Sequence, residues 1–215
     1  MNEILLTAAV LGIGYLLGCV STGILISKQA GVNIRQEGSK NTGASNVLRV
    51  LGAGRGAVTF LGDSLKAVIA CWIGSLLLPG ATFGIERFGI MAGGLGAILG
   101  HNWPIFFSFK GGKGIASSTA VLLFVDPLLG GIAIALCVAV IAWKRYISVG
   151  SLTMLFSFLV LTCMFHYDQW FACVFAAALF CLGLLRHRTN IRRLREGTEN
   201  KIGRSKKAAK QADKE

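Results

Sequence analysis

Long stretches without any charged residue are the feature that most limits how this chain can fold. Seven such stretches contain no Asp, Glu, Lys or Arg: 4–27, 67–85, 88–109, 114–125, 127–143, 146–167 and 169–185. A helix of about 20 apolar residues spans the hydrocarbon core of a bilayer. Only helices and closed barrels satisfy their own backbone hydrogen bonds there, and the alternating segments of about 10 residues that a barrel needs are absent. The sequence therefore predicts an all-α integral membrane protein.

Composition agrees with this class. Only 15% of the residues are charged and 53% are hydrophobic, and the mean hydropathy is +0.63. The first uncharged stretch, 4–27, follows Asn2 and Glu3 instead of a basic segment. It is also longer than the apolar core of a signal peptide, so we expect a retained helix.

The basic residues predict how the helices are oriented, because cytoplasmic loops are enriched in Lys and Arg. We expect seven transmembrane helices, two of them short, with the amino terminus outside and the carboxyl terminus in the cytoplasm. In that arrangement Arg87 faces outside, and these loop cations face the cytoplasm: Lys28, Arg35, Lys40, Arg49, Arg55, Lys110, Lys113, Lys144 and Arg145. The stretch 114–143 goes out and back, either as two short helices broken at Asp126 and Pro127 or as a re-entrant hairpin.

Half of the cations lie at the carboxyl-terminal end. Residues 186–215 hold 11 of the 22 Lys and Arg residues and only four acids. Nucleic-acid binding is one interpretation, but the segment directly follows a membrane helix, which favours attraction to anionic lipid headgroups. We expect one membrane-embedded domain over residues 1–202 and a basic, disordered cytoplasmic tail over 203–215, with membrane lipids as partners and no nucleic acid.

A polar segment, GSKNTGASNVLR at 38–49, lies close to the first apolar stretch. If 44–50 is helical, Asn46 and Arg49 share a face, and arginine suits bidentate binding of phosphate. A helix N-cap with a turn is the structural alternative. The residues of this segment that we expect to contact phosphate or hydroxyl oxygens are Gly38, Ser39, Asn41, Thr42, Gly43, Ser45, Asn46 and Arg49.

A second polar segment, FKGGKG at 109–114, has a related composition. Glycines allow backbone N–H groups to converge on an anion, and a helix that starts just after the segment adds its positive end. The spacing does not match a Walker A loop, and a flexible basic loop is the alternative. The expected phosphate-binding residues here are Lys110, Gly111, Gly112, Lys113 and Gly114. Two such segments on one side of a membrane favour a site that holds phosphate at the surface and an acyl chain in the bilayer.

Further polar residues lie at the ends of apolar stretches or inside them. Asp63 and Lys66 lie three residues apart within a helix, where a structural ion pair is expected. His101 is a candidate for orienting substrate or moving protons, with a structural role as the alternative. His187 and Asn190 share a helix face. The cysteines form no CxxC pair and indicate neither a metal site nor a disulfide framework.

These segments together resemble a known family. The segments GSKNTGASNVLR, GHNWPIFFSFKGGKG and RHRTNIRRLREGTENK, with the Asp63/Lys66 pair, are similar to motifs of the bacterial acyl-phosphate:glycerol-3-phosphate acyltransferases, the PlsY family. The resemblance covers about residues 5–202. It implies transfer of a fatty acyl group from acyl phosphate to the first hydroxyl of sn-glycerol 3-phosphate. The products are lysophosphatidate, for phospholipid biosynthesis, and inorganic phosphate. It further implies no metal or other cofactor, and a seven-helix protein in the bacterial inner membrane whose active site faces the cytoplasm.

The resemblance also assigns roles to positions. The residues it implies for catalysis are Ser39, Arg49, His101, Ser148, His187 and Asn190, and it gives Glu199 a structural role. Lys40 stands where a small residue is usual in the family, and Thr189 stands where an acidic residue is frequent. The general base is left open between His101, His187 and a substrate phosphate, and neither loop is assigned to a particular phosphate.

A transporter or binding protein for a phosphorylated anionic metabolite is the alternative function. Transporters also place helix breaks and cations at membrane depth. Here the cations cluster on one face, and no inverted repeat is found in the sequence, so the acyltransferase is the favoured interpretation.

Overall fold

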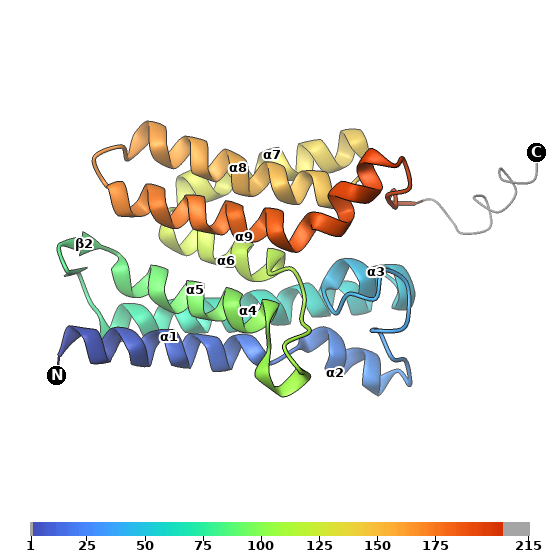
Figure 1. Cartoon of the computed structure of the whole chain (residues 1–215), viewed down its shortest axis with the longest axis horizontal. Coiled ribbons are helices and arrows are strands. Elements are labelled where there is room, and N and C mark those ends of the chain that lie inside the picture. Colours follow the sequence, from blue (N-terminus) through green and yellow to red (C-terminus); the bar gives the residue numbers. More distant parts are fainter. Residues whose placement is uncertain (1, 204–215) are drawn as a thin grey trace, which may run out of the picture.

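The computed structural model describes residues 2–203 as a bundle of helices with one small hairpin (Figure 1). The helices are α1 (Glu3–Cys19), α2 (Thr22–Gln29), α3 (Ala44–Leu51), α4 (Ala53–Leu77), α5 (Phe88–Asn102), α6 (Ile115–Val125), α7 (Pro127–Lys144), α8 (Ile147–Phe165) and α9 (Trp170–Arg195). A 3-10 turn covers Ile105–Phe107, and strands β1 (Ala81–Thr82) and β2 (Ile85–Glu86) pair antiparallel between α4 and α5. The predicted helical class is confirmed, with this two-residue ladder as its exception.

The helices form two layers with α6 between them. In Figure 1, α1, α2, α4 and α5 lie on one side and α7, α8 and α9 on the other. Helix α6 packs against α4, α5 and α7, and buried Val121 and Leu122 of α6 belong to the same core as Ile98 and Phe158. Helix α1 comes close to α5 because Gly18 faces α5, where a side chain would overlap the backbone at Ala97. Small residues allow such close helix packing in membranes.

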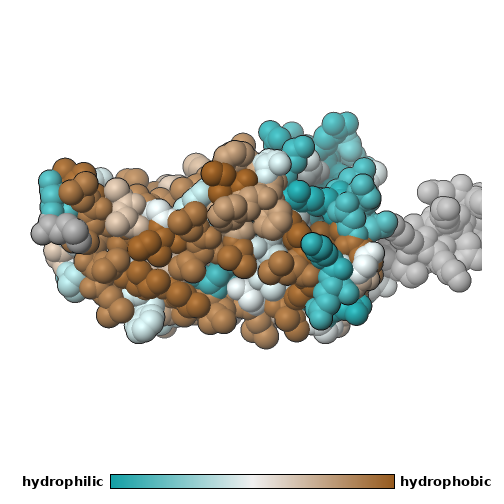
Figure 2. All heavy atoms as spheres, turned by 90° about the horizontal axis from the view of Figure 1, so that it is seen from below, coloured by the Kyte–Doolittle hydropathy of each residue, from teal (hydrophilic) through white to brown (hydrophobic). Residues whose placement is uncertain are grey.

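The surface is that of a membrane protein. Five segments of the described chain are long and apolar enough to cross a bilayer: Glu3–Gln29, Ala53–Leu77, Pro127–Lys144, Ile147–Phe165 and Trp170–Arg195. Figure 2 shows a broad hydrophobic face, with hydrophilic residues gathered mainly at one end of the molecule. Helix α5 has 15 residues and α6 has 11, so the count of seven crossings and their orientation stay predictions.

Two of the uncharged stretches are each divided into two helices. The stretch 4–27 is interrupted at Val20 and Ser21, between α1 and α2. The stretch 114–143 forms two helices that meet at Asp126, where the break was expected. Pro127 occupies the first turn of α7, where its missing N–H costs nothing, and the carboxylate of Asp126 accepts a hydrogen bond from the Leu129 N–H at 2.9 Å.

Asp126 also joins two helices, since its carboxylate lies 2.8 Å from Nε2 of His166 at the end of α8. Partial burial raises the pKa of Asp126, but the Leu129 N–H and His166 outweigh burial and hold the pKa below its usual value. A carboxyl group whose pKa is lowered by folding stabilises the protein above its unfolded pKa. That stability is lost as the pH falls through the folded pKa.

We predict that Asp126→Ala lowers the free energy of unfolding by about 1 kcal/mol near neutral pH, the usual cost of losing a helix N-cap. The difference from the unaltered protein should shrink as the pH falls below about 4, where the carboxyl group becomes protonated. Denaturant unfolding in detergent measures both effects. Asp126→Asn keeps the cap and is the matched control, so equal losses in the two variants would contradict the capping role.

Candidate active site

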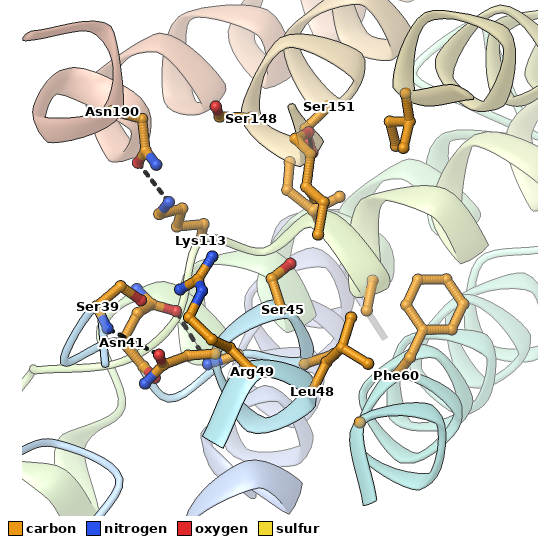
Figure 3. A pocket seen from close by; sticks show the side chains of 18 of the residues that line it. Ser39, Asn41, Ser45, Leu48, Arg49, Phe60, Lys113, Ser148, Ser151 and Asn190 are labelled. Atoms are coloured by element: carbon orange, nitrogen blue, oxygen red, sulfur yellow. Dashed lines mark hydrogen bonds between the residues drawn. The ribbon is translucent and has the colours of Figure 1, made fainter. Parts of the chain in front are cut away.

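A cavity of about 500 Å³ opens at the end of the molecule that carries the polar loops. Figure 3 shows Ser39, Asn41, Ser45 and Arg49 on one side of it, Ser148, Ser151 and Asn190 on the other, and Lys113 between them. Away from these groups the wall is apolar and comes from α3, α4, α7 and α8: Leu48, Phe60, Ile134, Val138, Ile141 and Met154. The cavity thus has a cationic, hydroxyl-rich end that continues into an apolar arm.

Asn46 shapes the first polar loop. Its side chain is buried and accepts a hydrogen bond from the Ser39 N–H at 2.8 Å. Its amide group donates to the carbonyls of Ile34, Glu37 and Asn41 at 2.9–3.3 Å. These bonds fold the loop onto α3, the predicted helix, and place Ser39 and Arg49 at the cavity. Asn46 therefore acts on the loop itself, and the N-cap of α3 is Gly43, without a side-chain capping bond.

Hydrogen bonds to its backbone groups hold the glycine segment 109–114 in place. The Gly112 N–H donates to the His101 carbonyl at 3.0 Å, and the Lys110 N–H donates to the Phe107 carbonyl at 3.2 Å. Arg186 of α9 donates to the carbonyls of Gly111 and Gly112 at 2.6–3.2 Å, and it lies over the ring of Trp103 at 5.1 Å. The amides of Lys110 and Gly112 are thus engaged by carbonyls of the protein, not free to converge on an anion.

Close packing explains the glycines of this segment. A side chain at Gly112 would overlap the imidazole of His101, and one at Gly111 would overlap the His101 carbonyl. Gly114 caps α6 with a φ of 75°, which favours glycine. Of residues 110–114 only Lys113 lines the cavity, where its ammonium donates to the side-chain oxygen of Asn190.

Glu199 connects the groups on the opposite wall. Its carboxylate accepts hydrogen bonds from Ser148 at 2.9 Å, from Asn190 at 2.6 Å and from Arg193 at 2.9 Å. His187 and Asn190 are buried on one face of α9, as predicted, and both line the cavity. The carboxylate therefore ties a serine of α8 to two side chains of α9.

Positive charge exceeds negative charge at this end of the cavity. Arg49, Lys113 and Arg193 line it together with Glu199. Burial lowers the pKa of Lys113 to about 8; Glu199 opposes the shift, and Arg193 and Arg49 add to it. Burial likewise lowers the pKa of Arg49. The nearby Glu199 raises this pKa, and the nearby Arg193 lowers it further. Cations that depress one another's pKa values form a site that an anion would stabilise.

The structure brings most of the predicted residues to this cavity. Those that line it are Ser39, Asn41, Gly43, Ser45, Asn46, Arg49, Asp63, His101, Lys113, Ser148, His187, Asn190 and Glu199. Those that do not line it are Gly38, Thr42, Lys66, Lys110, Gly111, Gly112 and Gly114. Among residues 2–203, no group of three or more His, Cys, Asp and Glu side chains could hold a metal ion.

Sequence reasoning missed several residues of the site. Arg35 donates to the Lys110 carbonyl at 2.7 Å and to the Phe107 carbonyl at 3.1 Å, so it holds the other end of the glycine segment. Arg186 and Arg193 were visible only as members of a basic stretch, because helical spacing does not say which arginines turn inward. A second polar cavity of about 250 Å³ adjoins the first and shares Ser39, Asn41, Lys113 and Arg193 with it.

The family model for glycerol-3-phosphate acyltransferases matches residues 8–197. The chain belongs to this family. The glycerol-3-phosphate acyltransferase of Thermoanaerobacter sp. (strain X514) is 44% identical over 193 residues, which cover 89% of this chain and 93% of the relative. That of Thermus thermophilus is 41% identical over 201 residues, covering 92% of this chain and 97% of the relative.

Two solved structures share the acyltransferase fold. They show PlsY (YgiH), described as an integral membrane glycerol 3-phosphate acyltransferase, in its glycerol 3-phosphate form and its lysophosphatidic acid form. The first has a TM-score of 0.83 and 34% identity, and covers 94% of this chain and 96% of that chain. The second has a TM-score of 0.81 and 34% identity, covering 92% and 95%. The family expected from the motifs and the integral membrane class are confirmed.

We predict that Arg186→Ala lowers acyltransferase kcat/KM by about 100-fold, because a displacement near 1 Å at a positioned site has an effect of this size. The substitution leaves the carbonyls of Gly111 and Gly112 without their donor, so Lys113 shifts with the segment. Steady-state kinetics in detergent measure the loss. Arg192→Ala is the control: Arg192 is exposed and, within residues 2–203, pairs only with Glu196, and such surface pairs contribute little. Equal kinetics for Arg186→Ala and the unaltered protein would contradict the role of Arg186 in holding the carbonyls of Gly111 and Gly112.

Proposed function

We propose that this protein transfers a fatty acyl group from acyl phosphate to the sn-1 hydroxyl of glycerol 3-phosphate. The products are lysophosphatidate, which enters phospholipid biosynthesis, and inorganic phosphate. One observation carries the proposal: a single cavity whose cationic end, with Arg49 and Lys113, continues into an apolar arm with Phe60 and Ile134. That shape and charge match a phosphate joined to an acyl chain. Membership of the glycerol-3-phosphate acyltransferase family supports the assignment of the acceptor.

The charge of the site supports acyl phosphate as donor. Two phosphate groups in one cavity repel each other, and nearby cations offset that repulsion. Arg49, Lys113 and Arg193 exceed the charges of Glu199 and of Asp63, which pairs with Lys66, so the cationic end suits two anions better than one. Glycerol 3-phosphate and lysophosphatidic acid, the ligands of the two solved relatives, differ by the acyl group that the apolar arm would hold.

The reaction needs no acyl-enzyme, because acyl phosphate already carries a good leaving group. The acceptor oxygen forms a bond to the acyl carbon, and the bond from that carbon to the phosphate oxygen breaks. The leaving phosphate keeps the electron pair, and the hydroxyl proton ends on the released phosphate. Positioning of this kind can supply about 7–11 kcal/mol of the barrier. Arg49 and Lys113 would hold phosphate oxygens, and Ser39, Ser148 and Asn190 would orient the hydroxyl.

The adjoining polar cavity gives the soluble molecules their own route. It is lined by Arg186, Arg188 and Thr189 and meets the main cavity at Lys113. Glycerol 3-phosphate would enter and inorganic phosphate leave through it, while the acyl chain stays in the apolar arm.

We extend the proposal to the membrane arrangement. The protein lies in the bacterial inner membrane with seven crossings, two of which are the helices of residues 114–143, α6 and α7. The amino terminus lies outside, and the cavity and carboxyl terminus face the cytoplasm, where the basic residues are expected. Residues 1–202 form one acyltransferase domain, and the basic tail predicted over 203–215 lies almost wholly outside the described residues, beyond residue 203.

The first test is turnover. Purified protein in detergent should release inorganic phosphate from acyl phosphate only when glycerol 3-phosphate is present, and acyl-CoA should not replace the donor. Arg49→Ala should lower kcat/KM by about 100-fold, since it removes a charge that stabilises the transition state.

Arg55→Ala is the matched control, because Arg55 lies on the same polar end but outside the cavity lining. Turnover with acyl-CoA alone would overturn the donor. Uptake of glycerol 3-phosphate into vesicles without any turnover would favour a transporter.

Lys113 gives a pH prediction. Phosphate binding needs the protonated amine, and the lowered pKa of about 8 means that the charge is lost as the pH rises through that value. The kcat/KM for glycerol 3-phosphate, which reports ionisation in the free enzyme, should therefore fall above about pH 8. Lys113→Arg keeps its charge and should extend activity to higher pH. An unchanged alkaline limb in Lys113→Arg would contradict this assignment.

A further inference from the structure

The turn between α5 and the glycine segment exposes large apolar side chains. Ile105 is 50% exposed, Phe106 69% and Phe109 55%. None of the three lines the main cavity or the adjoining polar cavity, so the proposed reaction does not account for them. Exposed apolar groups that lie close together mark a surface that another molecule covers.

This turn lies at the side of the molecule, not at its polar tip. In Figure 1 the green turn that follows α5 lies beside the gap between α1 and α2, while α2 and α3 continue past it toward the polar end. The Tyr15 hydroxyl of α1 donates to the Trp103 carbonyl at 2.8 Å, which fixes the start of the turn to α1. Helix α1 belongs to the apolar segment Glu3–Gln29, which is long enough to cross a bilayer. The exposed side chains therefore lie alongside a segment that can cross the membrane.

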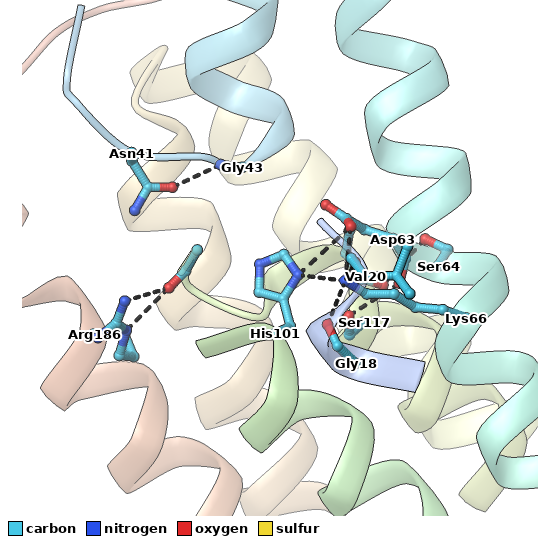
Figure 4. A network of polar contacts seen from close by, with 12 residues as sticks. Gly18, Val20, Asn41, Gly43, Asp63, Ser64, Lys66, His101, Ser117 and Arg186 are labelled. Carbon is cyan, nitrogen blue, oxygen red and sulfur yellow. Dashed lines mark hydrogen bonds and ion pairs between the residues drawn. The ribbon is translucent and has the colours of Figure 1, made fainter. Parts of the chain in front are cut away.

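Lys66 and His101 fix the buried side of this region (Figure 4). Lys66 of α4 donates to the carbonyls of Gly18 at 2.9 Å and Val20 at 2.6 Å, at the break between α1 and α2. Its ammonium also lies 3.1 Å from Nδ1 of His101, and the His101 ring packs against Gly112. The residues on both sides of the turn are thus held in the bundle, and the apolar side chains between them stay outside it.

Hydrogen bonds within the protein satisfy much of the backbone of the turn. The Pro104 carbonyl accepts from the Phe107 N–H at 3.1 Å and from the Phe109 N–H at 3.0 Å, and the Phe107 carbonyl accepts from the Lys110 N–H at 3.2 Å. Arg35 donates to the carbonyls of Phe107 at 3.1 Å and Lys110 at 2.7 Å. A loop in water can bond water at such groups, whereas lipid supplies no partner for a backbone. The turn is therefore suited to a place beside lipid.

The backbone of the turn is strained where it exposes Phe109. Ser108 and Phe109 both adopt the left-handed conformation, with φ of 55° and 57°. This conformation is unfavourable for residues that have a side chain. It brings no burial to the Phe109 ring, which stays more than half exposed. A contact of this ring outside the chain would compensate for the strain.

Cations border the exposed apolar side chains. The Arg35 guanidinium lies over the Phe107 ring, 5.4 Å from its centroid, and Lys110 at the end of the turn is exposed. Arg and Lys beside apolar groups are typical of segments at a membrane interface, since their charges reach lipid phosphates while their stems stay in apolar surroundings. This charge favours phospholipid over an apolar protein surface as the molecule that covers the turn.

We propose that Ile105, Phe106 and Phe109 insert among the phospholipids of the leaflet at the polar end, at the boundary between acyl chains and headgroups, and that this insertion holds the glycine segment in place. Lys113 follows Phe109 by four residues in the sequence, so a fixed turn also limits the movement of the Lys113 backbone. The insertion is independent of the reaction, whereas its effect on turnover rests on the proposed function.

Fluorine magnetic resonance tests the insertion directly. Trifluoromethyl-phenylalanine replaces Phe106 in the full-length protein, which is placed in nanodiscs of phosphatidylethanolamine and phosphatidylglycerol. We expect a lipid with a doxyl group near the headgroup end of its acyl chain to broaden the fluorine signal more than a water-soluble gadolinium chelate does. The same label at Phe156, half exposed in the middle of α8, gives the lipid reference, and at Arg192, exposed on α9, the water reference.

Each other result would overturn the insertion. Stronger broadening by the chelate would place Phe106 in water, where a soluble partner protein could cover it. Broadening by neither agent would mean that protein covers the ring, as in a dimer of this chain. The label keeps a phenylalanine ring at position 106, so the measurement is made on a nearly unaltered protein.

Phe106→Ser/Phe109→Ser tests whether insertion holds the glycine segment. In nanodiscs, we expect the amides of residues 105–113 to exchange with deuterated water about tenfold faster in this variant, since transfer of one phenylalanine side chain to an apolar phase contributes about that factor. The kcat/KM for glycerol 3-phosphate should fall as well. Phe83→Ser is the matched control, because Phe83 is 49% exposed in the hairpin at the opposite end of the molecule (Figure 1).

Unchanged exchange in a folded double variant, or equal changes in Phe83→Ser, would contradict the holding role. Faster exchange with unchanged kcat/KM would contradict the link between the turn and the site. Failure of the unaltered protein to turn over would instead contradict the proposed function, and the fluorine measurement would still decide whether the turn is inserted in lipid.

Discussion

The site depends on the hydrogen bonds from Arg186 to the carbonyls of Gly111 and Gly112. They tie α9, in one layer of helices, to the connection between α5 and α6, which belongs to the other. Every cationic group at the cavity is placed relative to this connection. Lys113 leaves the segment toward Asn190 of α9, and Arg49 approaches from α3 across the same space. A guanidinium suits this task because its planar donors bond two adjacent carbonyls at once. The two layers are thereby joined at the polar end, while the cavity between them stays open.

Acidic partners offset part of the free-energy cost of burying cations at this polar end. Buried cations without partners are costly, and here Lys113 bonds Asn190 and Arg193 bonds Glu199. Glu199 accepts from Ser148, Asn190 and Arg193, so its charge is spread over three donors and does not neutralise Lys113 or Arg49. The deeper pair, Asp63 and Lys66, neutralises itself and also satisfies the carbonyls at the break between α1 and α2. Positive charge thus remains available where phosphate is proposed to bind.

Local chemistry made parts of this arrangement predictable from the sequence. The break at Asp126 and Pro127 follows from an N-cap beside a proline, and the shared face of His187 and Asn190 follows from helical spacing. The break between α1 and α2 could not be predicted, because the lysine that satisfies its carbonyls comes more than 40 residues later on another helix. The clamp of Arg35 and Arg186 was hidden for the same reason: which arginine of a basic stretch turns inward depends on packing between distant segments. The apolar arm of the cavity could not be predicted from the sequence, because the residues that line it are of the same types as those that face the bilayer.

The glycine segment shows what composition alone does not reveal about a site. Glycines beside lysines resemble a cradle in which backbone N–H groups bind an anion. Here the N–H groups of Lys110 and Gly112 are taken by protein carbonyls, and the glycines are required because His101 packs against them. Side-chain donors also line the cavity, among them the Lys113 ammonium and the Arg49 guanidinium. Side-chain donors can be exchanged, titrated and positioned one at a time, whereas a backbone cradle cannot. The positions of these side chains depend on partners in distant segments, such as Asn190 for Lys113, that no segment-level pattern reveals.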